Sequence, residues 1–224
     1  MARLTRLVVA GQAHLVIQRG HNGMAVFVDA ADRKLFHAAL CEAALAERVL
    51  LHAYALLDLE VQLLATPPEA AALGRMVQAV GRRYVGAFNR RHQRQGTLWD
   101  GRFRSAVVEP GSMRLTTLRA VDGAGRIEWG SAAHRIGGPR DPCLVDPPEY
   151  WELGNTPFER EAAYRALLER ALAASIVTAL RSAALGGWVA GSAAFAAGVA
   201  EVASRPARPR SAGRPRRLDG VGQL

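Results

Sequence analysis

Apolar and polar positions along the first 122 residues alternate in patterns that predict six regular elements. Two segments, 29–47 and 69–92, have apolar residues at helical spacing. Their expected buried faces are Leu35, Phe36, Leu40 and Leu45 in the first helix, and Leu73, Met76, Val77, Val80, Tyr84 and Phe88 in the second. Short runs with β-branched residues, ended by turn residues, predict strands at 13–20, 49–57, 60–65 and 102–109.

The order of these elements is strand, helix, strand, strand, helix, strand. It predicts an α+β, ferredoxin-like fold (a split βαβ), in which a four-stranded antiparallel sheet carries helices on one face. Asp29 is a plausible N-cap of the first helix, and Ser112 is expected to cap a further helix that runs to about Ala120. Many functions use this fold, so the pattern alone indicates none of them.

The second half of the chain is predicted to be irregular at first and helical afterwards. Thr156, Pro157 and Glu159 form a capping box with proline at the first helical position, which starts a helix to about residue 173. Helical segments follow at 175–185 and, more weakly, at 188–203. We therefore expect a domain at 1–122, an irregular connection at 123–155, a helical extension at 156–203 and a disordered basic Arg/Pro-rich tail at 204–224.

Residues 182–200 carry no charge and are long enough to raise the question of a membrane span. They consist mostly of alanine, glycine and serine, which favour insertion weakly. A helix packed on the protein is the better interpretation, and no membrane partner is expected.

The positive charge of the chain is concentrated in two blocks. Residues 78–105 contain seven arginines and one acid, with four aromatic residues interleaved, and residues 205–217 contain six arginines and no acid. Subtracting both blocks from the formal net charge of +9 leaves −3 for the remainder, a distribution expected of a polyanion binder. Guanidinium groups match phosphates and aromatic faces stack on unpaired bases, so the first block predicts a nucleic-acid surface. The alternative is a solvated, salt-bridged helix face, which requires acids nearby.

Cys41 and Cys143 stand alone, without CxxC or metal-ligand spacing. They argue against a disulfide framework and fit a reducing compartment. The first twenty residues lack the long apolar run and cleavage site of a signal peptide, so we expect a cytoplasmic protein. His14 and His52, on predicted strands, are expected to be structural, and no His/Cys cluster is expected.

Three segments together resemble one protein family. VVAGQAHLVIQRGHNGMAVFVDAADRKLF, HAYALLDLEVQLLATP and MVQAVGRRYVGAFNRRHQRQGTLWDGRFRS are similar to the IS200-like, single-tyrosine transposases of bacterial insertion sequences, and most similar to the REP-associated tyrosine transposases. The stretch YWELGNTPFEREAAYRALLERAL and the later Gly187, Trp188, Gly191, Ser192 and Phe195 resemble the C-terminal part of that branch. The resemblance covers most of residues 1–200 and implies a ferredoxin-like HUH endonuclease fold.

The resemblance also implies a mechanism, and the chain departs from it at each catalytic point. In the family, two histidines on a strand hold a divalent metal, and a tyrosine on a later helix attacks the scissile phosphate. Here the histidine positions hold Glu60 and Gln62, and Ala120 stands at the tyrosine position. Glu60 and Gln62 alternate onto one strand face and offer oxygen ligands to Mg²⁺ or Mn²⁺, although a solvated strand face is the commoner outcome.

We therefore predict a diverged, catalytically inactive transposase-like protein that binds single-stranded or hairpin DNA, with Mg²⁺ or Mn²⁺ required only if activity remains. Gly213, Arg214, Pro215 and Arg216 resemble an AT-hook, and generic contact with DNA is an equal alternative. The predicted DNA-binding residues are Arg19, Arg82, Arg83, Arg90, Arg91, Arg94, Trp99, Arg102, Phe103, Arg104, Arg214 and Arg216.

Three competing hypotheses remain: an active enzyme that uses Glu60 and Gln62 with an unusual nucleophile, a remnant that binds nothing, and a membrane-attached protein. The resemblance allows a monomer or a homodimer and suggests a bacterial, nucleoid-associated protein.

Overall fold

The computed structural model describes residues 5–209. Arg214 and Arg216 of the predicted AT-hook lie outside the described residues. The strands are β1 (Ala13–Arg19), β2 (Leu50–Leu57), β3 (Glu60–Thr66), β4 (Arg104–Val108) and β5 (Val189–Ala190). The longer helices are α1 (Ala30–Ala46), α2 (Ala72–Arg91), α3 (Ser112–Asp122), α6 (Pro157–Glu169), α7 (Ala174–Gly186) and α8 (Ala193–Ala203), and the short helical turns are His21–Gly23, Ile127–Trp129, α4 (Ala132–Arg135) and α5 (Pro148–Trp151).

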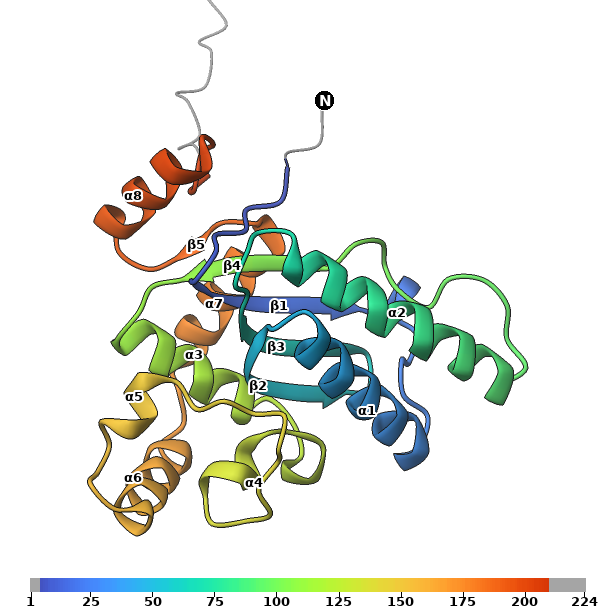
Figure 1. The fold of residues 1–224 in the computed structure, drawn as a ribbon, viewed down its shortest axis with the longest axis horizontal. Helices are drawn as coiled ribbons and strands as arrows, with labels where there is room; N and C mark the ends of the chain where they lie inside the picture. Colours follow the sequence, from blue (N-terminus) through green and yellow to red (C-terminus); the bar gives the residue numbers. More distant parts are fainter. Residues whose placement is uncertain (1–4, 210–224) are drawn as a thin grey trace, which may run out of the picture.

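The sheet has the strand order β2-β3-β1-β4-β5 (Figure 1). The first four strands are antiparallel to their neighbours, which is the ferredoxin-like order expected from the sequence. β5 adds two residues in parallel to β4, at Val107 and Val108. This fifth strand was not predicted, because a two-residue strand has no periodicity that a sequence pattern can show.

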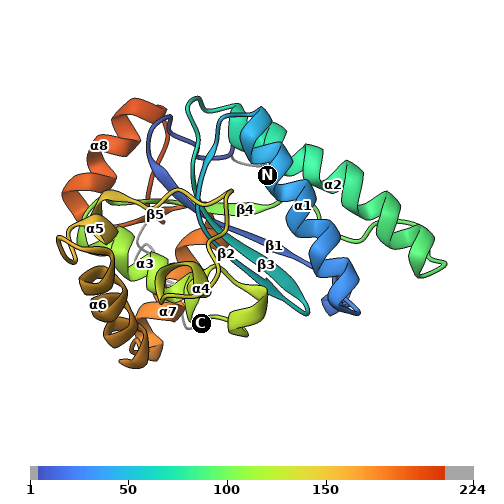
Figure 2. The same ribbon diagram turned by 60° about the horizontal axis from the view of Figure 1, so that its bottom comes forward.

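Helices α1 and α2 cover one face of the sheet, as predicted (Figure 2). The buried side of α2 contains all six apolar residues expected there. The predicted face of α1 was half wrong, because Leu35 and Leu45 are exposed and Ala39, Ala43 and Ala44 pack inward instead. The prediction gave large apolar residues preference over alanines, although Ala39, Ala43 and Ala44 have the helical spacing that continues the stripe of Phe36 and Leu40.

The helical extension covers the other face of the sheet. Side chains of α3, α6 and α7 pack there against Leu15, Ile17 and Leu64. The capping box of Thr156 and Glu159 is present as predicted, whereas Ser112 is the first residue of α3 and makes no capping hydrogen bond. The same hydrophobic core therefore joins the ferredoxin-like unit and the extension.

A buried ionic network secures the irregular connection against β2. Arg135 is fully buried, and its guanidinium donates to Asp122, 3.1 Å away, and to the carbonyl oxygen of His52. Its Nε also lies 2.8 Å from Asp146. Tyr164 of α6 donates to the same Asp122 at 2.6 Å. Two carboxylates thus neutralise one buried cation, as burial of charge requires.

The beginning of the basic tail is packed, against expectation. Ala207 is buried, and its carbonyl oxygen accepts from the backbone N–H of Val189 at 2.9 Å. Arg205 donates to the carbonyl oxygens of Thr5 and Gly187. Disorder was predicted from composition, and these contacts are between residues too distant in sequence for composition to show.

Cys41 and Cys143 are bonded to each other across 102 residues of sequence. The prediction that they stand alone was therefore wrong, because the fold brings α1 next to the segment before α5. His14 and His52 are structural as expected. Burial lowers the pKa of each to about 4, and each ring is hydrogen-bonded to backbone carbonyl oxygen, Gln12 for His14 and Val145 for His52.

Candidate nucleic-acid interface

The first candidate feature is a groove between α2 and the segment that leads into β4. It has a volume of about 620 Å³ and is continuous, through Arg6, Arg102 and Phe103, with a second hollow of about 230 Å³ at the end of α7. We call the two together the arginine groove. Its arginines are Arg6, Arg82, Arg102, Arg104 and Arg205, and no Asp or Glu is among its described lining residues.

Three of these arginines have no partner between residues 5 and 209. The side chains of Arg82, Arg102 and Arg104 are exposed and make no hydrogen bond or ion pair with the residues that the structure describes. Free guanidinium groups in a hollow without acids attract anions, and their fixed donor geometry suits phosphate oxygens. These three positions were predicted as DNA contacts, and the structure brings them together.

The wall of the groove formed by α2 contains three glycines. Gly74, Gly81 and Gly86 lie on this side of the helix, and a Cβ atom built at Gly81 meets nothing within 4 Å. Glycine inside a helix costs roughly 1 kcal/mol relative to alanine. No packing contact requires Gly81, so the residue leaves space in the groove at the expense of helix stability.

Other arginines of the predicted surface are paired with acids from distant elements. Arg83 pairs with Glu42, Arg91 with Asp29 and the buried Asp32, and Arg19 with Asp100 at 3.0 Å. The salt-bridged alternative therefore holds for these three positions. For Arg83 and Arg91 the acids come from α1 and the residue before it, outside the 78–105 block, and the one acid of that block, Asp100, pairs with Arg19 at the end of β1.

The remaining predicted DNA contacts, two arginines and two aromatic residues, differ in their exposure. Arg94 lies 5.6 Å from the ring centroid of Phe88, within cation–π distance, whereas Arg90 is exposed. Trp99 and Phe103 are only 7% and 6% exposed and belong to the core, so little of either ring face is open to a base. Phe103 is covered by the Arg6 guanidinium at 3.7 Å. Trp99 lines the groove, and its buried Nε1 donor has no partner among the described residues.

The second candidate feature is the pair at the expected metal position on β3. Glu60 and Gln62 lie on the same sheet face as Leu64, which packs toward α3 and α7. Both carboxylate oxygens of Glu60 accept from Arg181 of α7, one at 2.6 Å, and Gln62 Nε2 donates to Glu60 at 2.8 Å. Burial raises the pKa of Glu60, but the hydrogen bonds from Arg181 and Gln62 outweigh it and hold this pKa below its usual value.

These contacts do not fit a divalent cation. The guanidinium of Arg181 fills the position in front of Glu60, where a metal would need the same two oxygens as ligands. The amide of Gln62 presents a donor to the carboxylate rather than a free oxygen. The position predicted for Mg²⁺ or Mn²⁺ is therefore occupied by the guanidinium of Arg181. The sequence did not indicate that α7 lies next to β3.

The expected position of the nucleophilic tyrosine holds an alanine. Ala120 lies on α3, partly buried beside Leu167 and Leu168. All four tyrosine hydroxyls donate to protein acceptors: Tyr54 to Asp141, Tyr84 to the Val26 carbonyl, Tyr150 to the Arg135 carbonyl and Tyr164 to Asp122. Burial is the main cause that raises the pKa of each of them. A buried phenol with a raised pKa is a poor source of phenolate.

The fold and the groove define a ferredoxin-like α+β protein with a groove lined by arginines. No family model and no curated protein matches the chain. The solved structure of a REP-associated tyrosine transposase bound to a REP hairpin is similar, with a TM-score of 0.51 and 10% identity over 66% of this chain and 93% of that chain. A putative transposase from Deinococcus radiodurans is similar at a TM-score of 0.38 and 19% identity, over 55% of this chain and 98% of that chain.

At this identity, the first similarity establishes a shared fold. It confirms the fold that the sequence resemblance implied. Within the described residues, no helix is both long enough and apolar enough to cross a membrane.

Proposed function

We propose that this protein is a diverged relative of the single-tyrosine transposases that binds single-stranded or hairpin DNA without cutting it. The observation that carries the proposal is the arginine groove. Arg82, Arg102 and Arg104 are free of acids there, while neighbouring arginines are neutralised. Phosphates of a DNA backbone supply the anions that such a groove lacks.

The shared fold supports DNA as the partner. The similar transposase is described with a REP hairpin bound to it. A hairpin offers a phosphate backbone along its whole length. The proposed contacts are therefore guanidinium to phosphate at three points, Arg82, Arg102 and Arg104.

The closed position on β3 supports an inactive protein. A metal ion in this reaction class stabilises charge on the displaced oxygen through an open coordination position. Arg181 supplies positive charge at Glu60 but no open position and no activated water. With Ala120 in place of a tyrosine and every tyrosine hydroxyl engaged, the chain has neither nucleophile nor metal site for the family's chemistry.

The test is incubation of the purified protein with a labelled library of single-stranded hairpins, in Mg²⁺ or Mn²⁺, analysed on native and denaturing gels. A shift on the native gel without cleavage, weakened when Arg82, Arg102 and Arg104 are changed to Gln, is the expected result. A covalent adduct or a nick that disappears in Glu60→Ala overturns the inactive assignment. Affinity no greater than that of the isolated peptide 205–224 overturns the groove and indicates a remnant. Light scattering of the free and bound protein distinguishes a monomer from a homodimer.

A further inference from the structure

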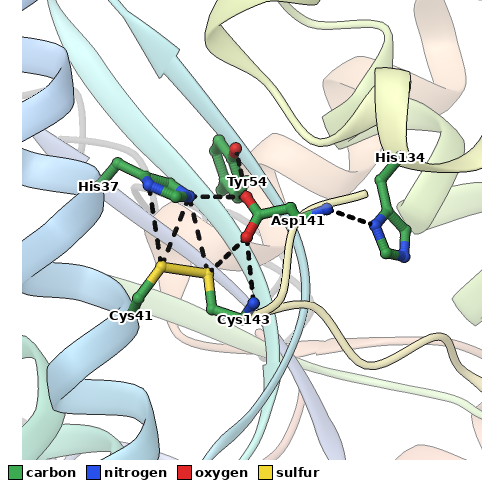
Figure 3. The surroundings of a disulfide bond; sticks show 6 residues. All are labelled: His37, Cys41, Tyr54, His134, Asp141 and Cys143. Carbon is green, nitrogen blue, oxygen red and sulfur yellow. Dashed lines mark hydrogen bonds and ion pairs between the residues drawn. A yellow bond between two sulfur atoms is a disulfide. The ribbon is translucent and has the colours of Figure 1, made fainter. Parts of the chain in front are cut away.

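Four metal-binding side chains meet on the far side of α1 from the arginine groove residues of α2. His37 and Cys41 lie one turn apart on α1, and Asp141 and Cys143 lie in the segment between α4 and α5 (Figure 3). One ligand atom from each residue lies within 4.8 Å of the others. Residues more than 100 positions apart thus supply two sulfurs, one imidazole nitrogen and one carboxylate to one point.

The contacts of His37 with the two sulfurs have the spacing of a tetrahedral zinc site. Nε2 of His37 lies 3.5 Å from the sulfur of Cys41 and 3.6 Å from that of Cys143. Zinc ligated at about 2.3 Å by sulfur and about 2.0 Å by nitrogen puts those two atoms roughly 3.5 Å apart. The other ligand atoms are closer together than around an ion: Oδ2 of Asp141 is hydrogen-bonded 2.6 Å from Nε2 of His37, Oδ1 lies 3.1 Å from the sulfur of Cys143, and the two sulfurs are bonded to each other. Binding of an ion therefore requires that the disulfide is reduced and that these atoms separate.

Surrounding groups orient the carboxylate. Tyr54 of β2 donates to Oδ2 of Asp141 at 2.8 Å, and the backbone N–H of Cys143 donates to Oδ1 at 3.1 Å. The backbone N–H of Asp141 itself donates to Nδ1 of His134 at 3.0 Å. Carboxylate ligands of metal sites are held by such outer hydrogen bonds, which fix the oxygen that faces the ion.

We propose that the reduced protein binds one zinc ion through Cys41, Cys143, His37 and Asp141, and that the disulfide is the metal-free, oxidised form of the same site. Two thiolates and one imidazole favour zinc over Mg²⁺ or Mn²⁺. A dithiol reductant supplies two electrons and two protons, so that the sulfur–sulfur bond breaks, two thiols form and the reductant becomes a disulfide. Each thiol then releases its proton to solvent as its sulfur binds the ion.

The site joins α1 to a segment that covers the edge of the sheet. Just after Cys143, Leu144 pairs with Leu51 at the free edge of β2, and Val145 N–H donates to the Leu51 carbonyl at 2.8 Å. A link between Cys143 and α1, through the disulfide or through a metal ion, keeps this segment paired with the edge strand β2. Without the segment, β2 would present unpaired backbone groups. A hollow of about 710 Å³, lined by His37, Tyr54 and Asp141, gives the ion a path from solvent.

The experiment uses the full chain, reduced and freed of reductant without oxygen, and titrated with Zn²⁺ against a chromophoric chelator. One zinc per chain is expected for the reduced protein and none for the oxidised protein, which is a control without any substitution. Co²⁺ in place of zinc should give thiolate-to-cobalt charge-transfer bands and the intense visible absorption of a tetrahedral ion. Tyr54→Phe, which keeps every ligand, should weaken zinc binding about 10- to 100-fold.

Cys143→Ser should abolish the charge-transfer bands from that sulfur and the stoichiometric binding, and circular dichroism reports whether the variant is folded. The proposal is overturned if the reduced wild-type chain binds no stoichiometric zinc. It is equally overturned if the reduced and oxidised chains bind zinc alike, or if bound Co²⁺ shows no thiolate bands, because each result places the metal elsewhere or leaves a disulfide only.

Discussion

The arginine groove makes a quantitative prediction about salt. Each phosphate that a cationic side chain neutralises on single-stranded DNA contributes about 0.7 to the slope of log affinity against log salt concentration. The groove presents three arginines, Arg82, Arg102 and Arg104, that have no partner in the described part of the chain. Changing all three to Gln should lower the magnitude of the slope by about 2, so that a fourfold rise in salt costs the variant roughly 20-fold less affinity than it costs the wild type.

Fluorescence anisotropy with a labelled hairpin, measured from 50 to 200 mM salt, gives both slopes. Arg83→Gln is the matched control, because Arg83 is the next residue on α2, carries the same charge and is exposed, but pairs with Glu42. Its slope should stay close to that of the wild type. All four arginines are on the surface, so the substitutions should change the melting temperature little. Measuring the melting temperature of each variant shows directly whether it is folded.

Two results would refute this reasoning. If the triple variant keeps the wild-type slope, the three arginines do not touch phosphates. If Arg83→Gln lowers the slope as much as Arg82→Gln alone, only the overall charge of the protein matters and the groove has no special role.

The other predictions concern stability. Gly81→Ala should raise the free energy of unfolding by about 0.5–1 kcal/mol, measured in urea, since the added methyl group clashes with nothing; a loss of stability would contradict the open groove wall. Arg181→Gln should lower the free energy of unfolding by about 1–3 kcal/mol at pH 7, because the Glu60 carboxylate loses its cationic partner. Because the pKa of Glu60 is lowered in the folded state, this contribution is present above its unfolded pKa and lost as the pH falls through the folded pKa, so the difference between variant and wild type should shrink once the pH falls below the ordinary value of 4.5. His14 and His52, each with a folded pKa of about 4, stay neutral in the folded protein and become protonated on unfolding. Together they should lower the free energy of unfolding by roughly 5 kcal/mol as the pH falls from 6.5 to 4, and a flat urea midpoint over that range would exclude their burial as neutral rings.

The sequence predicted the parts of the fold that depend on local pattern. The six elements of the ferredoxin-like unit and the capping box at Thr156 were found at their expected places, because strand alternation, helical spacing and caps are read within a few residues. Their order then determined the sheet, since few antiparallel arrangements suit it.

The site could be predicted only in part, because its character depends on residues distant in the chain. Which arginines are free is decided by Glu42, Asp29 and Asp32 on or next to α1, and no pattern within 78–105 contains that information. The ion pair between Glu60 and Arg181 joins residues that are 121 positions apart in the chain. The His37 and Cys41 spacing on one helical face was a readable signal, but it becomes a cluster only when Cys143 arrives from the other side.

The packed start of the tail has a consequence for how DNA is held. Arg205 lines the arginine groove, and the sequence after it adds Arg208, Arg210, Arg214, Arg216 and Arg217. The chain therefore enters its second basic block directly from the wall of the groove. If DNA occupies the groove as proposed, contact between that DNA and the arginines after Arg205 is an intramolecular event, governed by an effective concentration rather than by the concentration of free protein. The two basic blocks would then bind one DNA molecule as a bivalent unit, and removing the second block should speed the release of DNA more than it slows binding.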